Sequence, residues 1–141
     1  MLTGISPVIS PDLLKLLSEM GHGDEIVLAD SNYPGASLAR RLLRADGLNI
    51  STLLNGIMPL FPLDSYADPL IMMEEVAGDR KDPAVEADYM AVVRRHQPGA
   101  PSPIRVERHA FYERFRCAYA ILMTGETRVY GNLILKKGVI A

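Results

Sequence analysis

Short, almost wholly apolar runs alternate along this chain with helix-like segments, and this pattern limits its fold more than any other feature. Runs without a polar face are typical of strands that helices cover on both sides of a sheet. We therefore predict an α/β fold, a three-layer single domain with a mixed β-sheet flanked by helices. The expected strands span residues 25–29, 70–73, 104–106, 119–123 and 133–135, with 41–44 as a weaker candidate.

Helix caps and helical spacing predict the covering layers. A serine or aspartate followed by proline is typical of a helix start, because the side chain caps a free N–H and proline needs none. Helices are expected to begin at Ser10-Pro11, near Ser51 and at Asp82-Pro83, with a shorter one over residues 110–117. In the third, the residues expected to face inward are Val85, Tyr89, Val92 and Val93.

Two details of the C-terminal half carry further expectations. The last two strand candidates are joined by a short connection that contains Gly125-Glu126-Thr127-Arg128, a hairpin-like spacing that predicts at least one antiparallel pair. Cys117 is the only cysteine, so no internal disulfide can form. Its apolar surroundings predict a small buried hydrophobic side chain.

Composition excludes several classes of function. A chain of 141 residues fits one domain, residues 1–141, and 48% hydrophobic with 23% charged residues is ordinary globular composition. The net charge of −2 provides no basic field for nucleic acid or an anionic membrane. The N-terminus lacks the pattern of a signal peptide, and no apolar stretch approaches the ~20 residues that span a bilayer. We expect a cytoplasmic protein whose partner is a small neutral molecule.

His22 is the first candidate for chemistry. Gly21 and Gly23 flank it, and a strand follows that delivers Asp30 at its carboxyl end. Glycines leave the imidazole uncrowded, and Asp24 or Asp30 could orient the ring for acid–base work. Taken alone, the segment also fits a helix cap followed by a turn. The three histidines lack metal-ligand spacing, so no metal is expected.

Two later segments add polar groups suited to a sugar. Arg108 follows a strand and could aim its guanidinium at hydroxyl groups or a carboxylate. Tyr130 offers a flat ring and Asn132 donors and acceptors, while Gly131 between them allows close approach to the backbone. An apolar platform with a few directed polar groups is typical of a ligand pocket. Each segment alone also fits a solvated helix or a turn.

These blocks together resemble the L-fucose mutarotase (FucU/RbsD) family, and its fucose branch in particular. The resemblance runs over the whole chain, in the family's order. The matching blocks are residues 4–7, 19–27 (Glu-Met-Gly-His-Gly-Asp-Glu-Ile-Val), 44–47, 110–114, 124–126 (Thr-Gly-Glu) and 130–138 (Tyr-Gly-Asn-Leu-Ile-Leu-Lys-Lys-Gly).

The resemblance implies an isomerase that interconverts the anomers of L-fucose without a cofactor, in a ring-like homo-oligomer, commonly a decamer. It implies that His22 transfers the proton and that the sugar contacts Asp30, Arg108, Tyr130, Gly131 and Asn132. Alternatives stay open: a D-ribose pyranase, a noncatalytic sugar-binding accessory protein, or a purely structural ring protein.

Overall fold

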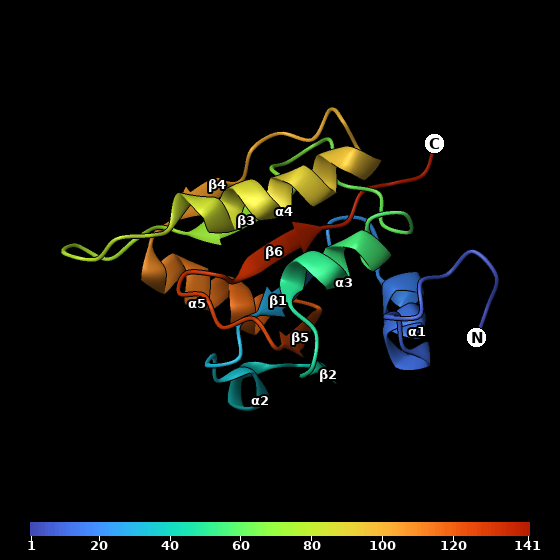
Figure 1. Ribbon diagram of the computed structural model, residues 1–141, viewed down its shortest axis with the longest axis horizontal. Helices are drawn as coiled ribbons and strands as arrows, with labels where there is room; N and C mark the ends of the chain where they lie inside the picture. The colour runs from blue at the N-terminus through green and yellow to red at the C-terminus, as the bar shows by residue number, and fades with distance from the viewer.

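The computed structural model describes all 141 residues and contains one six-stranded mixed sheet. Across the sheet the order is β2 (Leu42–Ala45), β5 (Ala120–Thr124), β1 (Glu25–Ala29), β6 (Leu133–Lys136), β3 (Leu70–Met73) and β4 (Ile104–Val106). Five strands run parallel to one another, and only β6, at the centre of Figure 1, runs antiparallel, between β1 and β3. The predicted mixed sheet is confirmed.

Helices cover both faces of this sheet. α1 (Pro11–Glu19), α3 (Ile50–Ile57) and α4 (Pro83–His96) pack on one face, and α5 (Arg108–Cys117) with the short α2 (Gly35–Leu38) on the other. The strand β1 shows the division, because Ile26 and Leu28 join one core while Val27 and Ala29 join the other. Side chains of a strand alternate between faces, so the three-layer expectation is confirmed.

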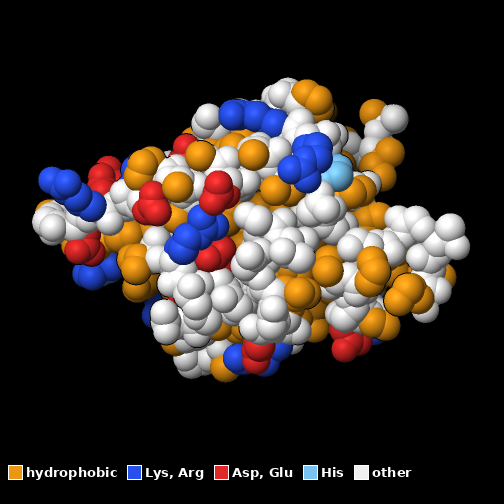
Figure 2. Space-filling view, viewed as in Figure 1, with side chains coloured by type: hydrophobic (Ala, Val, Ile, Leu, Met, Phe, Trp, Pro, Cys, Tyr) orange, Lys and Arg blue, Asp and Glu red, His pale blue; other side chains and the backbone are white.

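The surface over α4 mixes charges of both signs, whereas α3 has no charged residue (Figure 2). Hydrophobic side chains gather at the side where both chain ends lie (Figures 1 and 2). Exposed apolar residues at these ends are Met1, Leu2, Val139 and Ile140. No helix combines the length and the apolar character needed to cross a membrane.

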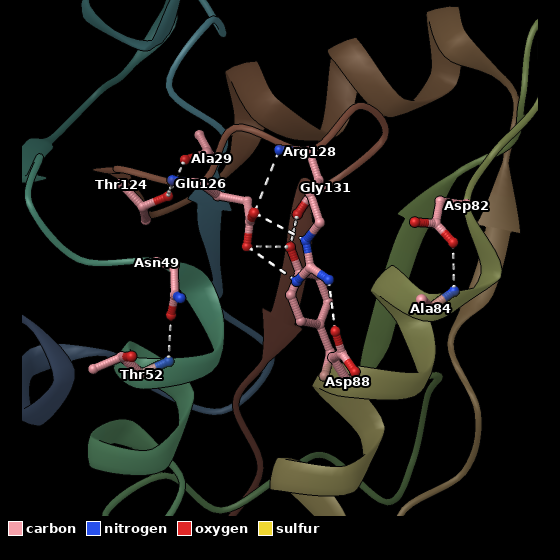
Figure 3. Close-up of polar contacts among 11 residues, drawn as sticks. Ala29, Asn49, Thr52, Asp82, Ala84, Asp88, Thr124, Glu126, Arg128 and Gly131 are labelled. Carbon is pink, nitrogen blue, oxygen red and sulfur yellow. Dashed lines mark hydrogen bonds and ion pairs between the residues drawn. The ribbon is translucent and has the colours of Figure 1, made fainter.

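The helix starts follow the predicted caps. Ser10 accepts a hydrogen bond from the Leu13 N–H, and Asp82 accepts one from the Ala84 N–H (Figure 3). α3 begins slightly earlier than expected, because Asn49 rather than Ser51 caps it. The four residues predicted to face inward from α4 are all buried.

The predicted antiparallel pairing is confirmed, but its partners differ from those that the spacing suggested. β5 and β6 form no hairpin, because residues 125–132 carry the chain past the end of β1, and β6 pairs antiparallel with β1 and β3 instead. The prediction for Cys117 is wrong. Cys117 is exposed rather than buried. Helical spacing in α5 turns Phe111 and Phe115 toward the core, and Cys117 falls on the outer side.

Candidate functional site

One edge of the sheet collects five of the six predicted site residues. Since five strands point the same way, their C-terminal ends meet at this edge together with the start of β6. Asp30 directly follows β1, Arg108 begins α5 just after β4, and Tyr130, Gly131 and Asn132 precede β6. We call these five residues the carboxyl edge. Ligands of α/β proteins commonly bind at the carboxyl ends of strands.

Asp30 and Asn132 lie in direct contact at the carboxyl edge. The Asp30 N–H donates to Oδ1 of Asn132 over 2.7 Å, and the Asp30 carboxylate accepts from the Asn32 N–H at 2.9 Å. Burial raises the pKa of Asp30, although the hydrogen bonds it accepts oppose the shift. Asn132 is buried, so the contact fixes its side chain against the backbone of Asp30.

Tyr130 has an unusual backbone and an occupied hydroxyl. Its φ of +58° lies in the left-handed region, which a tyrosine adopts only when its surroundings enforce it. The hydroxyl accepts from the Val76 N–H and donates to Asp79, each over 2.9 Å. Tyr130 can therefore contribute a ring wall or backbone groups more readily than a free hydroxyl.

Arg108 lies at the outer end of the carboxyl edge. It is exposed and lines a hollow of about 200 Å³ together with Glu107 and residues 74–77. Its guanidinium makes no hydrogen bond or ion pair within the chain, so its donors remain available to a ligand.

His22 lies at the opposite edge of the sheet, in the loop before β1. Its Nε2 is 3.0 Å from Oδ1 of Asp64, and the same oxygen accepts from the Tyr66 N–H over 3.0 Å. The His22 and Tyr66 rings are 5.3 Å apart. The prediction that Asp24 or Asp30 orients the imidazole is wrong.

The positions of the three aspartates explain why Asp64, and neither Asp24 nor Asp30, contacts the ring. The Asp24 carboxylate accepts from the Gly21 N–H over 2.7 Å and so closes the turn around His22. Asp30 lies beyond the far end of β1. Asp64 comes from the loop between α3 and β3 and meets the ring at Nε2.

The pairing with Asp64 determines which nitrogen of His22 is available. The Tyr66 N–H and His22 lower the pKa of Asp64, which therefore stays ionised and can only accept hydrogen bonds. Nε2 must then donate its proton to Asp64, leaving Nδ1 as the free base. The His22 side chain is 44% exposed, whereas that of Asp64 is 4% exposed. A carboxylate behind a histidine is the arrangement that holds a general acid–base in one tautomer.

A large hollow adjoins this pair. Its volume is about 730 Å³, and it is lined by residues 63–69, which include Asp64 and Tyr66, and by residues 97–101. A volume of this size accommodates a small molecule.

A single protomer does not bring His22 to the carboxyl edge. The five residues of β1 separate them, and at about 3.3 Å per residue they span roughly 16 Å. The six predicted residues therefore form two half-sites at opposite ends of β1, with His22 alone in one of them. No group of three or more His, Cys, Asp or Glu side chains comes close enough to hold a metal ion.

Sequence reasoning missed the partners of both half-sites. Nothing near Asp64 or Tyr66 marks them in the sequence, because they meet His22 only after folding across more than forty positions. Tyr89 was predicted to face inward, and its buried hydroxyl signals a polar partner. That partner is the carbonyl oxygen of Gly131, with Glu126 alongside.

Comparison with known proteins agrees with this architecture. The model of the RbsD/FucU transport protein family matches residues 3–140. The chain is 54% identical over 140 residues to the L-fucose mutarotase of Histophilus somni strain 2336, covering 99% of this chain and 97% of that protein. It is 51% identical to the fucose mutarotase of Streptococcus pneumoniae, whose crystal structure is a complex with L-fucose. The two structures superpose with a TM-score of 0.92 over 99% and 100% of the chains.

A more distant structure shares the fold alone. Bacillus subtilis RbsD, solved with D-ribose, is 20% identical and superposes with a TM-score of 0.73 over the full length of both chains. The match of the family model and the relatives above 50% identity, each over nearly the whole length, show that this chain belongs to the RbsD/FucU family.

Proposed function

We propose that the protein is an L-fucose mutarotase, an isomerase that interconverts the α and β anomers of the free sugar. The observation that carries the proposal is the 54% identity to an L-fucose mutarotase over almost the full length of both chains. The geometry supports it independently. One half-site presents a histidine backed by a buried carboxylate, and the other presents polar groups suited to sugar hydroxyls.

The two half-sites act together only if two protomers meet. A monosaccharide is much smaller than the length of β1, so one copy of the chain cannot hold it at Asp30 and reach it with His22. A head-to-tail contact between identical protomers would place the His22 half-site of one against the carboxyl edge of the next. Contacts of this kind close into rings when the rotation permits.

The proposed assembly is therefore a ring-like homo-oligomer, and the decamer is the form we propose. The exposed apolar residues at the two chain ends supply surface for contacts between copies. Native mass spectrometry tests the subunit count.

We also propose a cytoplasmic location, since the lone cysteine is exposed and unpaired, which suits a reducing compartment. Cell fractionation tests the location.

The reaction requires two proton movements. In ring opening, the anomeric hydroxyl loses its proton, the bond between C1 and the ring oxygen breaks, and the ring oxygen gains a proton. The aldehyde then rotates about C1–C2 and closes on its other face by the reverse steps. Water performs this slowly because no acid or base is positioned, and positioned acid–base groups typically contribute about 10²–10⁴-fold.

Residue roles follow from the two half-sites. His22 would act through Nδ1 on the ring oxygen, with Asp64 stabilising the imidazolium and fixing the ring. Asp30 or a bound water would accept the proton of the anomeric hydroxyl. Asn132 and Arg108 would bind the remaining hydroxyls, while Tyr130 and Gly131 would form the wall of the pocket. No cofactor is needed, because the aldehyde formed on opening requires only modest stabilisation.

Magnetisation-exchange NMR on equilibrated L-fucose tests the proposal, since the exchange rate between anomers reports the reaction directly. We expect exchange well above the buffer rate with L-fucose. A larger acceleration of pyranose–furanose exchange in D-ribose would favour a ribose pyranase instead. Saturable sugar binding without acceleration would identify a noncatalytic accessory protein and refute the proposal.

A further inference from the structure

Behind the carboxyl edge lies a buried carboxylate, that of Glu126. Its side chain is 5% exposed, and Arg128 clasps it, with Nε 3.1 Å from Oε2 and Nη2 3.3 Å from Oε1 (Figure 3). Burial opposes ionisation of Glu126, but the hydrogen bonds from Arg128 outweigh it and keep the pKa low. Arg128 also donates to Asp88 of α4 over 2.6 Å, which anchors the pair to that helix. Burying an ion pair costs free energy, because both charges lose their hydration. The Glu126–Arg128 pair is therefore expected to have a specific role.

Tyr89 connects this pair to one sugar-binding segment. The residue is fully buried on α4, and its hydroxyl lies 2.7 Å from the carbonyl oxygen of Gly131 and 3.3 Å from Oε1 of Glu126. The single hydroxyl proton faces both acceptors, with the carbonyl nearer. The backbone of Gly131 is thereby fixed by a hydrogen bond from the buried side of the chain.

The backbone of Glu126 connects the pair to the other sugar-binding segment. Its carbonyl oxygen accepts from the Ser31 N–H over 2.8 Å, directly after Asp30. Just before it, the Thr124 hydroxyl donates to the carbonyl oxygen of Ala29 over 2.8 Å and accepts from the Glu126 N–H over 3.1 Å (Figure 3). Glu126 therefore lies between the two segments of the carboxyl edge that carry Asp30 and Gly131.

The packing around Gly131 shows how tightly these parts fit. A Cβ at this position would lie 2.8 Å from the Arg128 carbonyl oxygen, 3.1 Å from Cγ of Glu126 and 3.2 Å from the Tyr89 hydroxyl. No side chain larger than hydrogen fits in that space. Directly beside it, Tyr130 holds its left-handed conformation, which tight surroundings must enforce.

We propose that Glu126 and Tyr89 are positioning residues that set the distance between Asp30 and the Gly131–Asn132 segment, and hence the affinity for sugar, without touching it. The inference rests on the proposed function. Binding groups must hold their geometry to about 0.5 Å, and residues that are themselves locked by packing and hydrogen bonds achieve this. Because these two residues support only the sugar-holding half-site, their loss should weaken binding rather than slow proton transfer at His22.

The test compares KM and kcat for L-fucose exchange in three variants. Tyr89→Phe removes only the hydroxyl and retains the buried ring. Glu126→Gln keeps the size and removes the charge. Val93→Ala is the matched control, because Val93 is fully buried one turn further along α4 and its apolar side chain takes no part in the hydrogen bonds of the network. KM comes from the dependence of the NMR exchange rate on sugar concentration, and thermal unfolding is measured in parallel.

We expect Tyr89→Phe to raise KM by about fivefold or more with kcat within about twofold, since a lost buried hydrogen bond has an effect of this order. Glu126→Gln should raise KM at least as far. Val93→Ala should lower the unfolding temperature and leave KM unchanged. An unchanged KM in Tyr89→Phe would overturn the inference, as would an equal rise in Val93→Ala. A wild-type protein that leaves exchange at the buffer rate would instead overturn the proposed function.

Discussion

Two inactive variants of this protein should restore each other's activity when mixed. His22→Ala removes the imidazole from one half-site, and Asp30→Ala removes a carboxylate from the other. Asp30→Ala is a mild truncation, because the backbone bond from position 30 to Asn132 survives it. Each variant alone is expected to lose most of the acceleration, on the order of 10²–10⁴-fold for His22→Ala.

Because roughly 16 Å separates the half-sites, one protomer cannot supply a complete site by itself. The size of the recovery then depends on how the two variants are distributed among neighbouring positions. If each site takes His22 from one protomer and Asp30 from its neighbour, a random equimolar mixture leaves about one quarter of the sites intact. Mixing His22→Ala with wild-type protein should by the same reasoning leave about one half. Co-refolding allows the protomers to exchange, native mass spectrometry confirms the mixing, and NMR exchange on L-fucose measures the rate.

A mixture no more active than the mean of its two components would refute the shared site. If His22→Ala alone equilibrated the anomers at the wild-type rate, the role of His22 in proton transfer would be refuted, whether or not the site is shared. Unchanged oligomer mass in both variants is the control against loss of assembly.

Three further predictions follow from the structure. Asp64→Asn should lower kcat by about tenfold with little change in KM, because a charge-assisted bond to His22 becomes neutral; an unchanged kcat would contradict the role of Asp64. Since burial raises the pKa of Asp30, KM should rise with acidification at a pH above that expected for an ordinary aspartate, as its carboxylate is protonated. In Asp30→Asn, KM should no longer rise in this pH range. If KM still rises on acidification in this variant, another group is responsible. Leu53→Ala, on the buried face of α3, should lower the free energy of unfolding in urea by about 3 kcal/mol; a loss below about 1 kcal/mol would mean that the core tolerates the cavity.

The layered fold was predictable because its signals are local. Helix caps such as Ser10-Pro11 and Asp82-Pro83 act within one turn, and apolar runs report burial on both faces directly. Strand order was not predictable in this way. The spacing between β5 and β6 favoured a hairpin, but β6 instead pairs between β1 and β3. Pairing over such distances depends on the whole sheet.

In the candidate site, too, the parts that depend on local signals were predictable and the long-range contacts were not. Asp30 and Asn132 could be placed at one edge, since strand ends and loop glycines can be recognised locally. The carboxylate behind His22 could not, because Asp64 reaches it from a distant loop and the nearer Asp24 is used in a turn. The separation of His22 from Asp30 was predictable, because the expected strand at residues 25–29 lies between them. The sequence pattern does not contain the strand order, which determines that Arg108 and residues 130–132 share the Asp30 end.

The central claim is that L-fucose binds between two copies of the chain, and a crystal structure of the complex tests it most directly. We predict the sugar ring oxygen within hydrogen-bonding distance of Nδ1 of His22 from one protomer, and the hydroxyls in contact with Asp30 and Asn132 of the adjacent one. L-fucose bound beyond the reach of every copy of His22 would contradict the account.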